Sequence, residues 1–331
     1  MSFTRSSILV SALPPSLGSG ELPARRPPDR SEGIVAAEPK IAATSSVPSL
    51  KARGLATGRM REVLRALWRS KTFLIGAGIV LFWVLDAIFW PLFVPYDPEG
   101  LVSPATLQPP SAEHLFGTDD LGRDIFSRTL AGARPTLTVA PLATALGVAG
   151  GILVGLFTGY YRGIADDIVM RIVDALLAFP LIIIAVLVIS ILGPSITNVI
   201  LVIGIVFMPI VARTVRSAVL VERQREYVAA AKLLGNSDLY IMFAEILPNI
   251  MGPIAVEITI RLGYAIFTSA TLSFLALGIQ QPSPDWGLTI SIGRVFLQTA
   301  PSEVLFPAAA LATLIVGVNL IADGLRQVLE E

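Results

Sequence analysis

Long runs of apolar residues, separated by short polar segments, fill the chain after about residue 70. Six of these runs approach the roughly 17–25 residues that a helix needs to cross a bilayer. They cover residues 73–94, 137–157, 175–192, 196–212, 254–277 and 304–322. Only Gly193-Pro194-Ser195 separates the third run from the fourth, and this turn sequence predicts a tight helical hairpin. The pattern predicts an all-α, polytopic membrane protein with six transmembrane helices.

The first 72 residues have a different character. Residues 1–55 are rich in Pro, Ser, Ala, Gly and Arg. They hold too few apolar residues to offset the entropy of ordering, so we expect a disordered tail. Residues 56–72 are basic, and Leu64, Leu67 and Trp68 are interleaved with the charges. This favours an amphipathic helix that lies on anionic lipid.

The distribution of Lys and Arg between the loops predicts the orientation of the chain. Basic residues gather before the first window, between the second and third windows, and in residues 213–250, whereas residues 95–113 hold no Lys or Arg. We therefore expect both termini and the loop 213–250 in the cytoplasm. Residues 95–135 are then an extracytoplasmic loop between a first transmembrane helix, 73–94, and a core of five further helices, 136–325.

Composition agrees with a membrane protein and excludes several other functions. Only 15% of the residues are charged, against about 25% in an average soluble protein. The net charge is zero, which gives no bias toward nucleic acid. The absence of Cys excludes disulfides and thiolate chemistry. The single histidine, His114, excludes a multi-histidine metal site, and we expect it to be solvated.

The chain also lacks the phosphate-binding loop of an ATPase. Such a loop needs Gly-Lys followed by Ser or Thr, so that the lysine reaches the phosphates. The lysines are Lys40, Lys51, Lys71 and Lys232. None of them follows a glycine, so we expect neither bound ATP nor an enzymatic function in this chain.

Ionisable residues inside or beside the apolar windows are candidates for a pore or for polar contacts between helices. They are Asp86, Arg171, Asp174, Glu257 and Arg261. Asp86 lies mid-membrane at a cost of about 3 kcal/mol, so it should face protein, either for function or as a structural hydrogen bond. Glu257 and Arg261 are four residues apart with the acid first, which lets them pair on one helix face. We favour that self-neutralisation over substrate binding.

The loop 213–250 has the pattern of two short helices joined at a glycine. Tyr227, Ala230, Ala231 and Leu234 recur at helical spacing. Gly235 suits the position after the helix C-cap, where φ is positive. Ser237 is a candidate N-cap for a second helix, which we expect to stop near Leu247-Pro248. The alternatives are a docking element for a soluble partner and an amphipathic loop helix that packs on its own membrane face.

Residues 226–235, with Leu247-Pro248-Asn249, resemble the EAA loop of ABC-importer permeases. The resemblance implies that the loop contacts an ATPase subunit through Glu226, Tyr227, the alanines 229–231, Gly235, Leu247 and Pro248. The chain departs from the family pattern at two positions. The motif's Glu falls on Ala229, so the acidic contact is either absent or supplied by Glu226. In addition, Glu245 stands at the position before x-Leu-Pro where the motif has an apolar residue.

A second segment, residues 114–128, resembles the signature that follows the first helix in the C-type permeases for dipeptides, oligopeptides and nickel. Its characteristic residues are Gly117, Thr118, Asp119, Gly122, Arg123 and Asp124. We expect an interfacial helix capped by Thr118 or Asp119, which either gates the path and contacts a binding protein or merely anchors the subunit. Residues 176–180, 272–287 and 319–326 also resemble this family, so the likeness extends over about residues 70–330.

The resemblance implies a type I ABC-importer permease fold in the inner membrane of a prokaryote. It implies translocation of dipeptides or oligopeptides by alternating access, with nickel, glutathione or another small solute as alternatives. The implied partners are a second homologous permease, two ATPase subunits that bind ATP and Mg, an extracytoplasmic binding protein and the lipid bilayer. A membrane enzyme and an ion-coupled transporter are the competing classes. The sequence shows neither intramembrane histidine nor paired aspartates for the first, and no clear inverted repeat for the second.

Overall fold

The computed structural model describes residues 65–101 and 104–330. The predicted tail, 1–55, and residues 56–64 of the basic segment lie outside the described residues. Within the described part the regular elements are helices, together with one isolated β-bridge between Thr118 and Asp124. The long helices are α2 (Lys71–Phe93), α4 (Ala133–Tyr161), α7 (Ile196–Glu222), α11 (Met251–Phe274) and α13 (Ser302–Glu330). The shorter ones are α3 (Ile125–Ala131), α5 (Ile164–Leu177), α6 (Leu181–Leu192), α8 (Glu226–Leu233), α9 (Asp238–Tyr240), α10 (Leu247–Asn249) and α12 (Trp286–Gly293).

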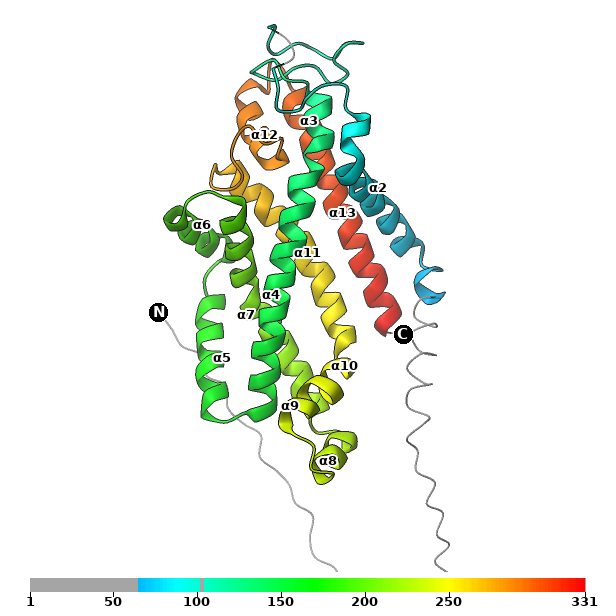
Figure 1. The fold of residues 1–331 in the computed structure, drawn as a ribbon, viewed down its shortest axis with the longest axis vertical. Coiled ribbons are helices and arrows are strands. Elements are labelled where there is room, and N and C mark those ends of the chain that lie inside the picture. Colours follow the sequence, from blue (N-terminus) through cyan, green and yellow to red (C-terminus); the bar gives the residue numbers. More distant parts are fainter. Residues whose placement is uncertain (1–64, 102–103, 331) are drawn as a thin grey trace, which may run out of the picture. The chain divides into compact units, whose positions relative to one another are not determined.

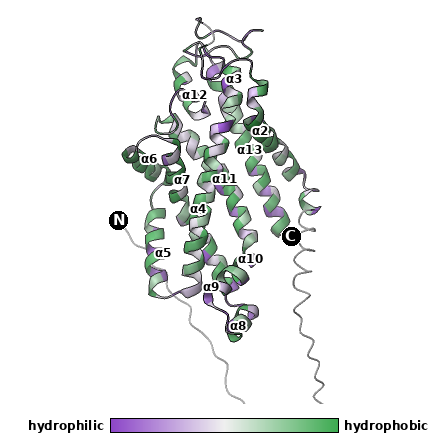
Figure 2. Cartoon of the chain, viewed as in Figure 1, coloured by the Kyte–Doolittle hydropathy of each residue, from purple (hydrophilic) through white to green (hydrophobic). Residues whose placement is uncertain are grey.

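Five spans in the described residues are long and apolar enough to cross a membrane: α2, α3 with α4 (Ile125–Tyr161), α7, α11 and α13. The third predicted span, 175–192, is not one straight helix. α5 and α6 meet there at 90°, and the described residues hold six candidate spans if this bent pair is counted as one. Pro180 explains the break, because it lacks an N–H and disfavours helical geometry at Phe179. α6 is hydrophobic along nearly its whole length (Figure 2).

α4 and α7 pack along a stripe of glycines (Figure 1). Gly147, Gly151, Gly155 and Gly159 recur every four residues on the side of α4 that faces α7. A Cβ atom at Gly151 would lie 2.5 Å from the Cβ of Val211, and one at Gly155 would lie 2.6 Å from the Cβ of Val215. Small residues at this spacing let two membrane helices approach closely, so their backbones make the main contact of the bundle.

Two apolar cores lie along the bundle. One brings together buried residues of α2, α4, α6, α7, α11 and α13, and includes Trp83, Ile203 and Trp286. The other joins the C-terminal halves of α4 and α7 to the segment 228–254. α3 and α12 lie at one end of the bundle, and α8 and α9 at the opposite end (Figure 1).

Candidate functional site

The first arm of the predicted docking element is helix α8, and it ends as the sequence predicts. Gly235 has φ of +77°, and the N–H of Asn236 donates to the carbonyl of Ala231 at 3.2 Å. The N–H of Gly235 donates to the carbonyl of Lys232 at 3.0 Å. These two bonds form a Schellman motif, which satisfies the last carbonyls of the helix and reverses the chain.

The second arm begins at Ser237, whose hydroxyl accepts the N–H of Tyr240 at 3.3 Å. α9 then continues through a π-helical turn, Ile241–Ile246, into α10. α10 ends at Asn249, close to the expected stop near Leu247-Pro248, and helical geometry breaks at Ile250. The wider π turn immediately precedes Pro248, which has no N–H to place in a regular α-helical ladder.

The helical loop from 226 to 248 is fastened to the C-terminal ends of α4 and α7. Val228, Ala231 and Ile246 are buried in one apolar core with Val215 and Val219 of α7. On α4, the hydroxyl of Tyr160 donates to Asp238 at 2.6 Å. The ammonium of Lys232 lies 5.0 Å from the centroid of the Tyr160 ring. Since both arms contact the same two membrane helices, a displacement of the loop must act on α4 and α7 together.

The remaining face of the loop is exposed. Leu233 is 90% exposed and Leu234 is 80% exposed, and Ala229 and Ala230 are exposed beside them. The predicted apolar face is therefore divided, because Ala231 points into the core while Ala230 and Leu234 point outward. This exposed surface, comprising Ala229, Ala230, Leu233 and Leu234, is called the loop tip below. Leu233 and Leu234 are neighbours in the chain, so they add two large apolar side chains to this exposed surface.

The acidic residue of this loop lies at the start of α8. Glu226 is exposed in the first helical turn, where a carboxylate is favoured by the helix dipole. Tyr227, the next residue, turns back and donates its hydroxyl to Glu222 of α7 at 3.0 Å. Burial, together with the hydrogen bond to this carboxylate, raises the pKa of Tyr227 to about 12. Tyr227 is therefore a neutral anchor, whereas Glu226 is open to a partner.

Two of the candidate polar residues lie on the surface of α5. Arg171 is exposed and forms no ion pair with the described residues. Asp174 pairs with Arg213 of α7, and both side chains are more than half exposed. A stronger pair, missed in the sequence, joins the same helices: Arg216 binds both oxygens of Asp166 at 2.7 Å. These contacts hold α5 against α7.

The other candidates are buried. Glu257 and Arg261 pair within α11 at 2.7 Å, which agrees with the predicted self-neutralisation. The contact is an ion pair without aligned hydrogen-bond geometry, and the Arg261 guanidinium also lies 5.1 Å from the ring of Tyr264. Asp86 is 5% exposed, and its Oδ2 has no hydrogen-bond partner among the described residues. It faces protein, as expected, but does not meet the other four candidates.

Residues 117–124, called the outer motif below because the sequence predicts them on the extracytoplasmic side, form a buried turn. This corrects the prediction of an interfacial helix capped at Thr118 or Asp119. The Asp119 carboxylate accepts the backbone N–H groups of Leu121 and Arg123, at 3.0 and 2.8 Å, and the Arg123 Nε at 2.6 Å. Gly122 has φ of +76°, a left-handed geometry that no helix interior allows. Gly117 is equally constrained, because a Cβ there would lie 2.2 Å from the Gln108 carbonyl oxygen.

Asp124 is the actual cap of this helix, and it also engages the only histidine. Its carboxylate accepts the N–H of Ser127 at 2.8 Å and lies 3.1 Å from Nδ1 of His114. His114 is 3% exposed, so the expectation of a solvated histidine is wrong. Thr118 is fully buried and accepts the N–H of Gln108 at 2.9 Å. The motif therefore shapes the outer loop from within rather than presenting a polar surface.

Asp120 is the least buried acid of this turn. Its carboxylate lies 3.8 Å from Arg123. Burial raises the pKa of Asp120, and the neighbouring charge of Asp119 adds to that effect.

Arg128 is a further structural residue that the sequence did not reveal. It is 1% exposed, and its guanidinium donates to the carbonyls of Pro98 at 2.6 Å, Pro282 at 3.3 Å and Ser283 at 3.2 Å. One side chain thus joins the outer loop after α2 to the loop before α12. A lone arginine three residues into a helix carries no sequence signal for contacts with loops so distant in the chain.

Comparison with known families places these features in context. Residues 151–331 match the family described as the binding-protein-dependent transport system inner membrane component. Residues 58–110 match the N-terminal TM domain of oligopeptide transport permease C. The chain belongs to this family of ABC-importer permeases. The resemblance noted from the sequence is confirmed, and so is the class of membrane transport subunit.

Two curated permeases are similar over nearly their whole length. The dipeptide transport system permease protein DppC of Alkalihalophilus pseudofirmus is 41% identical over 294 residues, which are 89% of this chain and 97% of that protein. The glutathione transport system permease protein GsiD of Pectobacterium atrosepticum is 38% identical, over 82% of this chain and 92% of that protein. At this identity and coverage, both relatives place the chain in the permease family.

A solved structure confirms the permease fold. The inward-facing MetNI methionine ABC transporter contains a chain that aligns with a TM-score of 0.51 and 21% identity, covering 61% of this chain and 96% of that one. At this identity the likeness concerns the fold alone. The whole helical loop, 226–248, lies within the segment that matches the permease family, 151–331. The outer motif, 117–124, lies between the two matched segments.

Proposed function

We propose that this permease forms one half of a peptide-translocating path and is driven by ATPase subunits through the helical loop 226–248. The observation that carries the proposal is the loop tip. It exposes Leu233 and Leu234, while the same helix buries Val228 and Ala231 against α4 and α7. A force applied at the tip is therefore transmitted to the two helices that make the closest contact in the bundle.

The shape of the tip favours contact by apolar packing. Ala229 stands where the family motif has a glutamate, so no carboxylate projects from that position. Small exposed alanines beside two leucines suit insertion into an apolar cleft of a soluble partner. Glu226, one turn earlier, is exposed and supplies the acidic group if the partner requires one.

Co-purification tests this contact. Leu233→Asp places a charge at a residue that is 90% exposed, so folding should be unaffected. We expect the variant to lose most of the ATPase that wild-type brings down, since a buried unpaired charge costs several kcal/mol. Ile164→Asp is the matched control, because Ile164 is 79% exposed at the N-terminus of α5. Equal recovery of ATPase by wild-type and Leu233→Asp would exclude the tip as the docking surface.

The proposed arrangement has the permease in the inner membrane with both termini in the cytoplasm. A second, homologous permease completes the path, two ATPase subunits bind ATP and Mg, and a binding protein delivers the substrate. Arg162 and Arg171, between the second and third apolar windows, and the five Lys and Arg residues of 213–250 support this orientation. The likeness to permeases of binding-protein-dependent systems supports the set of partners.

The proposed substrates are dipeptides or oligopeptides. The similarity to a dipeptide permease and to putative peptide permeases of Brucella supports this class, and a glutathione permease is nearly as similar. Glutathione is the second candidate on that ground. Uptake of a labelled dipeptide into cells expressing the complete transporter, in competition with glutathione and nickel, separates these candidates. Uptake that persists without ATPase subunits would instead favour an ion-coupled transporter.

A further inference from the structure

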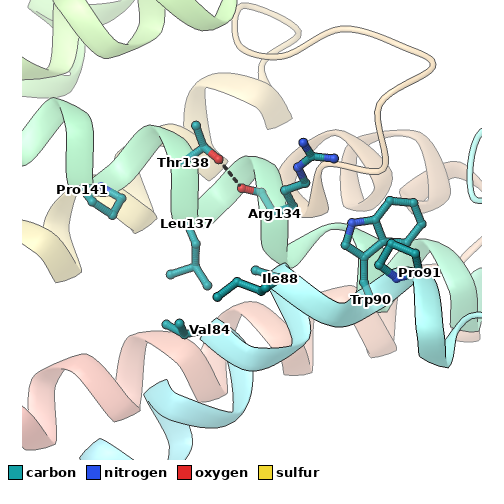
Figure 3. A pocket seen from close by; sticks show the side chains of 9 residues that line it. Val84, Ile88, Trp90, Pro91, Arg134, Leu137, Thr138 and Pro141 are labelled. Atoms are coloured by element: carbon teal, nitrogen blue, oxygen red, sulfur yellow. Dashed lines mark hydrogen bonds between the residues drawn. The ribbon is translucent and has the colours of Figure 1, made fainter.

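An open groove of about 540 Å³ runs between α2 and α4 on the outer half of the bundle. Its lining is Val84, Ala87, Ile88, Trp90, Pro91, Arg134, Leu137, Thr138 and Pro141. Figure 3 shows Arg134 and Trp90 at one end, with Val84 and Pro141 at the other. Its volume lies in the range of small-molecule sites, roughly 300–1,000 Å³.

The polarity of the groove changes along its length. Trp90 lies near the C-terminus of α2, and Arg134 lies near the N-terminus of α4, so both belong to the end that carries α3 and α12. Val84 and Pro141 lie about two turns farther into the bundle, roughly 10 Å at 1.5 Å per residue. The groove is thus polar at the proposed outer interface and apolar toward the membrane centre. A phospholipid in the outer leaflet has the same order, with its headgroup at the interface and its acyl chains toward the centre.

The polar end has unused hydrogen-bonding capacity. The guanidinium of Arg134 is exposed and has no ion pair among the described residues. The indole N–H of Trp90 has no acceptor there, and its nitrogen lies on the side of the ring that faces Arg134 (Figure 3). The Thr138 hydroxyl, in contrast, is already bound to the Arg134 carbonyl at 2.8 Å. The Arg134 guanidinium and the Trp90 indole N–H therefore both stand at this end of the groove without a protein partner among the described residues.

We infer that this groove binds an anionic phospholipid of the outer leaflet. The phosphate contacts Arg134 and Trp90, and an acyl chain lies along Ile88, Leu137 and Val84. α2 buries only 17% of its apolar window inside the chain, against 28–50% for the other four single spans, so its outward surface is available to lipid. Tryptophan and arginine at the membrane interface are typical of such headgroup contacts.

Native mass spectrometry of the complete transporter, purified in detergent and titrated with phosphatidylglycerol or phosphatidylcholine, tests the inference. We expect this chain to retain one phosphatidylglycerol at least threefold more than phosphatidylcholine. Arg134→Gln should reduce retention to the phosphatidylcholine level. Arg294→Gln, an equal loss of charge at an exposed residue on the same end of the bundle, should leave it unchanged. Leu137→Trp, which fills the groove without changing charge, should reduce retention of both lipids.

Three results would overturn the inference. They are equal retention of the two lipids by wild-type, undiminished phosphatidylglycerol on Arg134→Gln, and a photo-crosslinker at Ile88 that captures a protein subunit instead of lipid. The last result would make the groove a subunit interface. Thermal unfolding of each variant without added lipid reports whether it is folded, and a folded Arg134→Gln that is no longer stabilised by phosphatidylglycerol is the supporting outcome.

Discussion

Arg128 and Asp285 show how single buried ionisable side chains organise the outer end of this permease, where the chain has little regular structure. Arg128 donates to three loop carbonyls. Asp285 is 2% exposed and caps α12 by accepting the N–H of Leu288 at 2.9 Å. Each side chain replaces water as the partner of buried backbone groups, so its removal has a specific energetic cost.

We predict that Arg128→Met lowers the free energy of unfolding by about 3 kcal/mol, because one buried and two partly buried loop carbonyls lose a charged donor. The unfolding midpoint in detergent, measured by intrinsic fluorescence, checks this. Arg171→Met is the control, since Arg171 is exposed and has no ion pair among the described residues. Matching midpoints for the two variants would show that Arg128 does not hold the outer loops together.

Asp285 predicts a pH dependence of stability. Burial raises the pKa of Asp285 to about 6 from its ordinary value of 3.8. The folded state therefore binds the proton more tightly than the unfolded state. The contribution of Asp285 to the free energy of unfolding is therefore complete below pH 4. It is lost as the pH rises through about 6, a change of about 3 kcal/mol.

Asp285→Asn should remove this part of the pH dependence, because the amide oxygen can still cap α12 without titrating. Thermal unfolding of wild-type and variant between pH 4 and pH 7 is the measurement. Parallel stability curves for the two proteins over this interval would show that another group titrates there.

At the scale of elements, the glycine stripe of α4 has the largest structural consequence. The stripe fixes the approach of α4 to α7, and both helices carry the helical loop at their C-terminal ends. Counting apolar residues along the sequence locates α4 as a membrane-spanning helix. It does not reveal this stripe, because the stripe depends on the spacing of the glycines and not on the number of apolar residues. The spacing of 147, 151, 155 and 159 was present in the sequence, and only the identity of the partner helix required the structure.

We predict that Gly151→Ala destabilises the protein by 1–3 kcal/mol, a typical cost of overpacking, because its Cβ would lie 2.5 Å from that of Val211. Gly252→Ala in α11 is the matched control, since a Cβ there meets nothing within 4 Å. The control should be neutral, or more stable by up to about 1 kcal/mol through helix propensity. Chemical unfolding midpoints report both, and equal shifts in the two variants would contradict close packing at the stripe.

Other elements show where sequence patterns reach their limit. The reversal at Gly235 and the cap at Ser237 follow from local backbone chemistry, so residue types predicted them correctly. At the outer motif, Thr118, Asp119 and Asp124 can all cap a helix, and tertiary contacts choose Asp124 while Asp119 closes a turn with Arg123. At residues 175–192, continuous hydrophobicity hid the break that Pro180 imposes.

At the scale of the whole molecule, the proposed coupling to ATPase subunits depends on how the helical loop is joined to the bundle. The loop tip is exposed, whereas Val228, Ala231 and Ile246 of the same loop are buried in a core with α4 and α7. The glycine stripe joins those two helices along their length. Ion pairs from Arg213 and Arg216 tie α5 to the same unit. Movement at the tip is thus expected to shift α4, α5 and α7 together relative to the rest of the bundle.

Cysteine labelling at the loop tip tests this account most directly, because the natural chain contains no cysteine. In Leu233→Cys, a membrane-impermeant maleimide should react in inside-out vesicles but not in right-side-out vesicles. Added ATPase should reduce the labelling severalfold, whereas labelling of the control Ile164→Cys should not change. Labelling of Leu233→Cys in right-side-out vesicles would contradict a cytoplasmic position of the loop. Labelling that does not change when ATPase is added would contradict contact between the loop tip and the ATPase subunits.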